Sequence, residues 1–127
     1  MSGAFIFVGT HRIKDGKLEE FKEEAQSLVE LVEANEPQLL AFAMFLNQDE
    51  TEATVVQVHP DADSMLRHME VANAHIRRST EVLETKEIQI YGPANDGVLG
   101  MISELTQAGV PISVKPTVLT GFTRGPA

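Results

Sequence analysis

The sequence contains no cysteine and no tryptophan among its 127 residues, and only one tyrosine. Without cysteine the chain cannot form a disulfide bond, attack through a thiolate or bind a metal through sulfur. Basic residues are also scarce: 10 lysines and arginines stand against 19 aspartates and glutamates, a net charge of −9. Nucleic-acid phosphates and anionic membrane surfaces repel such a chain when it has no basic cluster. We therefore expect neither nucleic acid nor membrane as a partner.

Long apolar runs are missing as well. The apolar run over residues 4–8 is too short for the core of a signal peptide, and no stretch approaches the ~20 residues of a membrane span. Hydrophobic residues nevertheless make up 43% of the chain, enough for a buried core. We therefore expect one domain over residues 1–127, in a cytoplasmic protein.

Two common catalytic loops are absent. Gly92, Gly97 and Gly100 have neither the lysine of a phosphate-binding loop nor the spacing of a dinucleotide-binding loop. The sequence also lacks the Gly-x-Ser-x-Gly pattern of serine hydrolases. Neither nucleotide binding nor serine-hydrolase chemistry therefore has its usual signal.

The apolar pattern predicts strands and helices in the order β-α-β-β-α-β, which is typical of a ferredoxin-like α+β domain. The expected strands cover residues 4–13, 39–46, 53–59 and 86–93. The expected helices cover residues 17–35 and a second segment that is capped by Asp61 or Asp63 and ends near Leu83. A third helix over residues 96–108 and an extended segment over 112–122 complete a C-terminal extension, residues 95–127.

The predicted strands are apolar on both faces. Phe5 and Phe7 point to one side of the first strand and Ile6 and Val8 to the other, and residues 39–46 are a continuous apolar run. Two helices can cover only one face of the sheet. At ~25 cal/mol per Å² of apolar surface, leaving the other face in water forgoes several kcal/mol. We therefore expect a homodimer packed sheet to sheet; the alternative is that the third helix folds over this face.

Three segments carry a family resemblance: residues 5–13, the sequence NEPQLLAF over 35–42, and HPDADSMLRH over 59–68. Over residues 4–94 the chain resembles the antibiotic-biosynthesis-monooxygenase-like group of the dimeric α+β barrel superfamily. The resemblance implies ligands bound between helices and sheet. It also implies activities such as cofactor-free oxygenation of polycyclic phenols, haem breakdown, or decomposition or cyclisation of small organic molecules.

The sequence departs from that group at several positions. Gln38 stands where glycine is usual, Gln57 where an acidic residue is common, and His59 where an aromatic residue is common. The haem-degrading members of the group rely on a tryptophan, which this chain lacks. Haem degradation is therefore disfavoured.

The histidines are the first candidates for chemistry, because their side chains titrate near neutral pH. We predict His11 and His68 as catalytic residues that position or deprotonate a substrate. The predicted substrate-binding residues are His59, Tyr91, Met65 and Met69. A strand-end histidine facing solvent, a boundary histidine and core methionines are the structural alternatives. His68 and His75 are seven residues apart rather than four, so we expect no metal site, and no motif indicates a cofactor.

Three functions remain open at this stage. One is a cofactor-independent, monooxygenase-like enzyme that acts on a small aromatic or polyketide-like compound. Another is a non-catalytic dimeric module that binds a small apolar ligand or stabilises a partner. The third is a purely structural role, which follows if the C-terminal helix and strand occlude the pocket.

Overall fold

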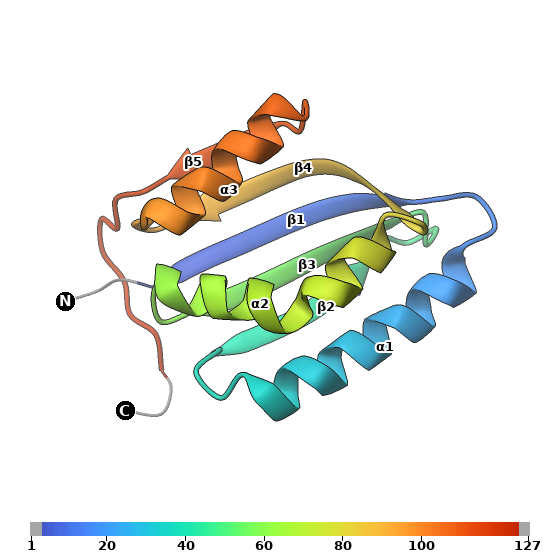
Figure 1. Cartoon of the computed structure of the whole chain (residues 1–127), viewed down its shortest axis with the longest axis horizontal. Coiled ribbons are helices and arrows are strands. Elements are labelled where there is room, and N and C mark those ends of the chain that lie inside the picture. Colours follow the sequence, from blue (N-terminus) through green and yellow to red (C-terminus); the bar gives the residue numbers. More distant parts are fainter. Residues whose placement is uncertain (1–3, 125–127) are drawn as a thin grey trace.

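The computed structural model describes residues 4–124, which form eight elements (Figure 1). In chain order these are β1 (Phe5–Ile13), α1 (Leu18–Asn35), β2 (Ala41–Leu46), β3 (Glu52–His59), α2 (Ala62–Ser79), β4 (Leu83–Tyr91), α3 (Asp96–Gln107) and β5 (Ile112–Lys115). The first six elements follow the predicted order, and the ferredoxin-like α+β fold is confirmed.

The sheet has the strand order β2-β3-β1-β4-β5, with β1 in the centre. Strand β1 pairs antiparallel with β3 and β4, and its register with β4 shifts between Thr10 and His11. Strand β5 joins β4 in parallel, with Ile88 opposite Ile112. A parallel neighbour needs a crossover connection, which α3 supplies. The C-terminal extension therefore widens the sheet by one strand.

All three helices lie on the same face of the sheet (Figure 1). The larger core cluster joins Met65 of α2 and Val98 of α3 to Phe5 and Ile90 of the sheet. Helix α3 also lies close to α2, since a methyl group on Gly97 would come within 2.6 Å of a Leu66 methyl carbon. The third helix does not cover the other face, so the alternative to a dimer that the sequence left open is wrong.

The boundary between α2 and β4 differs from the prediction. Helix α2 ends at Ser79 rather than near Leu83, and β4 begins at Leu83, three residues before the predicted start at Lys86. The chain turns at residues 80–82, where the backbone N–H of Val82 donates to the Ser79 carbonyl over 3.0 Å. The Val82 side chain is 1% exposed and packs in a core cluster with Ile13. Val82 is therefore buried in the connection between α2 and β4, where the sequence predicted the last turn of the helix.

Side chains cap the last two helices at their first turns. The Asp61 carboxylate accepts from the backbone N–H of Ser64 over 2.9 Å, as the sequence predicted for Asp61 or Asp63. The Asn95 side chain accepts from the backbone N–H of Val98 over 2.8 Å. The start of α2 is therefore fixed close to the end of β3.

The face of the sheet opposite the helices, called the open face below, has an apolar half and a polar half. The ladder places Val8 opposite Val56 and Ile6 opposite Val58, and these side chains point away from the helices. The apolar half consists of Ile6, Val8, Ala41, Ala43, Val56, Val58 and Tyr91.

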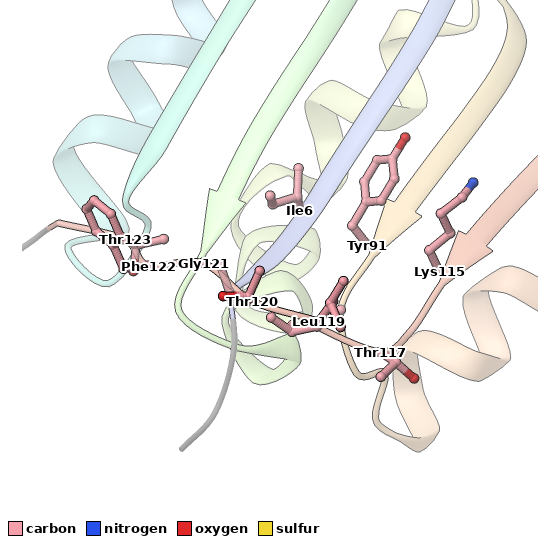
Figure 2. Close-up of a pocket in the computed structure, with 12 residues that line it drawn as sticks. Ile6, Tyr91, Lys115, Thr117, Leu119, Thr120, Gly121, Phe122 and Thr123 are labelled. Carbon is pink, nitrogen blue, oxygen red and sulfur yellow. The ribbon is translucent and has the colours of Figure 1, made fainter.

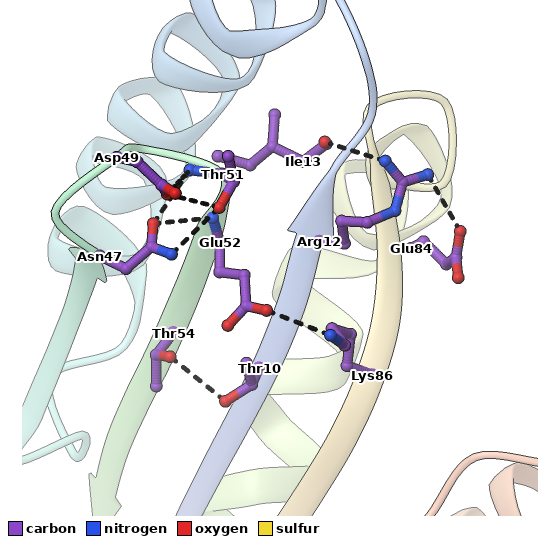
Figure 3. A network of polar contacts seen from close by, with 10 residues as sticks. All are labelled: Thr10, Arg12, Ile13, Asn47, Asp49, Thr51, Glu52, Thr54, Glu84 and Lys86. Atoms are coloured by element: carbon purple, nitrogen blue, oxygen red, sulfur yellow. Dashed lines mark hydrogen bonds and ion pairs between the residues drawn. The ribbon is translucent and has the colours of Figure 1, made fainter.

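The polar half is held by contacts across the strands (Figure 3). Arg12 pairs with Glu84 and Lys86 with Glu52, each over 3.2 Å, and the hydroxyls of Thr10 and Thr54 also lie 3.2 Å apart. Exposed pairs of this kind contribute little stability, ~0–1 kcal/mol each. Glu87, opposite Thr10, adds an exposed carboxylate to this end of the open face.

Replacing Ile90 with alanine tests the larger core cluster. Ile90 is fully buried, so Ile90→Ala removes contacts and leaves a cavity, and it should lower the free energy of unfolding by ~2–5 kcal/mol. Leu99→Ala is the matched control, because Leu99 is 54% exposed on α3. It should change the stability by less than ~0.5 kcal/mol in urea unfolding. Equal effects of the two substitutions would contradict the described packing.

Candidate functional site

Five buried polar residues gather where β3 ends and α2 begins. The buried polar or charged residues of the described chain, residues 4–124, are Glu36, Gln57, His59, Ser64 and His68. They come from the C-terminal end of α1, from β3 and from the first two turns of α2. Because buried polar groups need partners, this convergence makes the cluster the candidate site.

Glu36 and His68 form a buried pair at the centre of this cluster. The Nδ1 atom of His68 lies 3.0 Å and 3.2 Å from the two carboxylate oxygens of Glu36. The Glu36 side chain has no exposed surface and that of His68 is 3% exposed. A proton on Nδ1 that is donated to the carboxylate leaves Nε2 as the basic nitrogen of the ring. Nε2 has no hydrogen-bond partner within residues 4–124.

The local sequence explains how Glu36 enters the interior. It is the residue directly after α1, and its backbone N–H still donates to the Val32 carbonyl over 2.9 Å. Pro37 follows and cannot continue the helix. The glutamate therefore sits where the chain turns from the helix toward β2, with its side chain toward α2 rather than toward water.

His59 lies beside His68 and is held as a neutral ring. Its Nε2 atom is 2.9 Å from Oε1 of Gln57, and its Nδ1 atom is 2.6 Å from the Ser64 hydroxyl. With the Gln57 carbonyl oxygen as acceptor, Nε2 carries the proton and Nδ1 accepts from the Ser64 hydroxyl. Burial, together with the nearby His68, lowers the pKa of His59 to about 4. The two imidazole centroids are 6.1 Å apart.

A groove leads to this pair between the end of α1 and the start of β2. It has a volume of about 320 Å³, near the lower end of the ~300–1,000 Å³ typical of ligand pockets. Glu36 and Phe42 both line it, and both contact His68: the Phe42 and His68 rings are 5.3 Å apart. The other lining residues are Val29, Val32, Glu33, Pro37, Leu39, Leu40 and Ala41, so the wall combines aliphatic side chains with about as much polar surface. His68 lies behind this wall, in contact with the two lining residues Glu36 and Phe42.

His11, the other predicted catalytic residue, lies elsewhere. It stands opposite Ala53 on β3, and its Nδ1 atom is 3.0 Å from the Thr85 hydroxyl. Burial lowers its pKa. Ala53 and His59 are six residues apart on β3, which separates them by ~20 Å at ~3.3 Å per residue. The structure therefore does not bring His11 and His68 into one site, although the sequence hypothesis had them act together.

The predicted substrate-binding residues are divided among three places. His59 belongs to the buried cluster. Met65 is 3% exposed in the larger core cluster, and Met69 packs against that cluster. Tyr91 lies on the open face, in a separate pocket with Ile6 (Figure 2). Their roles in binding remain predictions.

The sequence did not single out Glu36, Gln57 or Ser64 as site residues. Glu36 belongs to the Glu-Pro sequence that carried the family resemblance, and its place just before Pro37 was the available signal. Gln57 stood out only as a departure from the family pattern. Ser64 resembled an ordinary residue of a first helical turn, and only the spatial closeness of β3 and α2 reveals its contact with His59.

Two further observations concern metal sites and membrane-spanning helices. Within residues 4–124, no three histidine, aspartate or glutamate side chains are grouped so that they could hold a metal ion. None of the helices in that part of the chain combines the length and the apolar composition that a membrane crossing requires.

No protein-family model matches the sequence, and no curated protein matches it significantly. Solved structures do resemble it. MupZ from Pseudomonas fluorescens superposes with a TM-score of 0.74 at 17% identity, over 95% of this chain and 94% of MupZ. Coverage that high extends beyond residue 94, so the similarity to MupZ includes most of the C-terminal extension.

Two shorter solved structures match about three quarters of this chain. SnoaB, a cofactor-independent oxygenase from Streptomyces nogalater, has a TM-score of 0.61 at 15% identity, over 72% of this chain and 94% of its own. A candidate antibiotic biosynthesis monooxygenase from Nitrosomonas europaea has a TM-score of 0.63 at 17% identity, over 75% of this chain and 97% of its own. The resemblance to the antibiotic-biosynthesis-monooxygenase-like group is thereby confirmed at the level of the fold.

The depressed pKa of His59 predicts a loss of stability in acid. The unfolded chain binds a proton at this histidine below pH ~6.5, whereas the folded protein does so only near pH 4, so stability falls as the pH drops through that interval. His59→Gln removes this titration. Urea unfolding at pH 7 and pH ~4.5 should show that the wild type loses up to ~3 kcal/mol more than the variant. Equal losses would contradict a neutral, buried His59.

Proposed function

We propose that this protein is a cofactor-independent enzyme in which His68 acts as a general base on a small aromatic or polyketide-like substrate. One observation carries the proposal: the buried His68 Nδ1 lies 3.0 Å from Glu36, which lines a groove together with Phe42 and several aliphatic residues. A histidine paired with a carboxylate in this way is suited to accept a proton at Nε2.

The proposed reaction begins with removal of a proton from a phenolic or enolic hydroxyl of the substrate. Nε2 of His68 accepts this proton, and the Glu36 carboxylate stabilises the imidazolium that forms. Removing the proton raises the electron density of the substrate ring, as a reaction with dioxygen without a cofactor requires. Phe42 and the aliphatic groove residues would hold the ring beside His68.

His59 would help to keep the proton on His68. Because its pKa is lowered to about 4, His59 does not compete as a base near neutral pH. Its ring packs edge to face against that of His68 and is itself held by Gln57 and Ser64. The neutral His59 ring therefore packs against the His68 ring and helps to fix its orientation.

The similarity to SnoaB supports the class of reaction. That protein is described as a cofactor-independent oxygenase and shares the fold over most of its length. At 15% identity the similarity carries no information on the substrate. The substrate class is supported by Phe42 and the aliphatic side chains that line the groove.

Substitution of His68 tests the proposed base. With dithranol as a polycyclic phenol, His68→Asn should reduce substrate-dependent oxygen uptake by ~100-fold or more, because general bases contribute ~10²–10⁴ to rates. Glu36→Gln should reduce kcat at least ~10-fold with little change in KM, because the Glu36 side chain has no exposed surface and acts by orienting the base.

His75→Asn is the matched control for both changes. His75 also donates from its ring toward a glutamate, with Nδ1 3.1 Å from Glu24, but this pair is partly exposed between α1 and α2. The His75→Asn variant should leave oxygen uptake within about twofold of the wild-type rate, and circular dichroism should show all variants folded. Wild-type-like turnover by His68→Asn would contradict the proposal. Thermal stabilisation of the wild type by dithranol without oxygen uptake would favour the non-catalytic binding module instead.

We further propose that the protein is a homodimer that pairs through the open face. The helices leave the apolar half of this face uncovered, and α3, the available internal cover, lies on the opposite side. A second copy would bury the same surface on both partners, as two-fold symmetry requires.

A further inference from the structure

The segment after β5, residues 116–124, carries three apolar side chains that lie exposed. Leu119 is 94% exposed, Phe122 is 78% exposed and Val118 is 43% exposed. Figure 2 shows this segment crossing the sheet near the start of β1. Burying such side chains is worth ~1.5–3 kcal/mol each, so a chain that leaves them in water forgoes a large stabilisation.

The segment does not pack tightly onto the sheet it crosses. A pocket of about 610 Å³ lies between residues 117–123 and the open face, where Ile6 and Tyr91 form part of its wall (Figure 2). The pocket is therefore continuous with the apolar half of the open face. A partner that covers this face therefore also contacts residues 117–123 and the pocket.

The size of the open face indicates how much additional surface a stable dimer needs. The five strands are 9, 6, 8, 9 and 4 residues long and ~4.8 Å apart, so the sheet covers a flat area of roughly 600 Å². A stable interface buries ~800 Å² of accessible surface per partner. The exposed leucine and phenylalanine of residues 116–124 add apolar surface beside this face, because one phenylalanine can bury ~150 Å² or more.

Charge also favours a second copy over other partners. Two ion pairs lie across the polar end of the open face, Arg12 with Glu84 and Lys86 with Glu52 (Figure 3), and Glu87 opposite Thr10 adds an exposed carboxylate. The apolar half contains no charged side chain, so an identical face can approach there without meeting a charge of its own sign. A nucleic acid or an anionic membrane would instead meet a chain with a net charge of −9.

We infer that residues 116–124 form an arm that packs on a second copy of this chain, with Leu119 and Phe122 as its anchors. Apolar side chains of the partner's open face fill the pocket beneath the arm. The symmetry makes the contact reciprocal, so each protomer is clasped by the other's arm. The inference rests on the homodimer stated under Proposed function and adds the segment that closes it.

The double variant Leu119→Asp/Phe122→Asp tests the arm. Sedimentation equilibrium over a concentration series should give the wild type a mass of twice 13.9 kDa. The double variant should dissociate with a Kd raised at least ~100-fold. Leu99→Asp is the matched control, because Leu99 is 54% exposed and belongs to α3, which lies on the other face of the sheet. This variant should leave the Kd unchanged. None of these side chains is buried, so circular dichroism should show all variants folded.

Val8→Asp separates failure of the arm from failure of the dimer. The Val8→Asp variant places a charge in the middle of the open face and should also yield monomers. If this variant does not fold, Phe45→Asp replaces it, because Phe45 is 58% exposed on the same face. Monomers from Val8→Asp together with an intact dimer of the arm variant would overturn the arm alone. A wild type that is monomeric throughout the series would overturn the homodimer and the arm together, without affecting the proposed role of His68.

Discussion

The carboxylate of Glu36 has no exposed surface, and the arrangement of the candidate site depends on how that charge is accommodated. An isolated carboxylate cannot remain ionised in an apolar interior without a partner. His68 supplies the partner, which ties the end of α1 to the second turn of α2. The same contact turns the basic nitrogen of His68 away from the carboxylate and brings Phe42 against its ring. A structural requirement and a chemical capability therefore come from one interaction.

A second constraint acts on the other side of the sheet. The three helices are all used on one face, where they enclose the core and border the histidine cluster. The strands remain apolar over one half of the face that the helices leave uncovered. The helix side carries the groove and the buried pair, and the open face carries the surface that we propose pairs with a second copy. Tyr91 illustrates the division, because its strand places it on the open face rather than beside His68.

The fold could be predicted from the sequence because it depends on local patterns: apolar periodicity, Pro37 just after the end of the first helix, and a capping aspartate. The site could be predicted only in part. His68 was recognised from its residue type, but its partner Glu36 is one of many glutamates and differs from them only by its place at the helix end. His11 was grouped with His68 because both are histidines on predicted apolar elements. Their separation follows from the strand register, which a sequence pattern does not reveal.

A crystal structure with a bound naphthol would show whether a small aromatic molecule binds beside the Glu36–His68 pair. We expect the naphthol ring to lie in the groove between α1 and β2, near Phe42, with its hydroxyl oxygen within ~3 Å of Nε2 of His68. A naphthol bound instead in the pocket beside Tyr91 on the open face, with the groove empty, would contradict the proposed site.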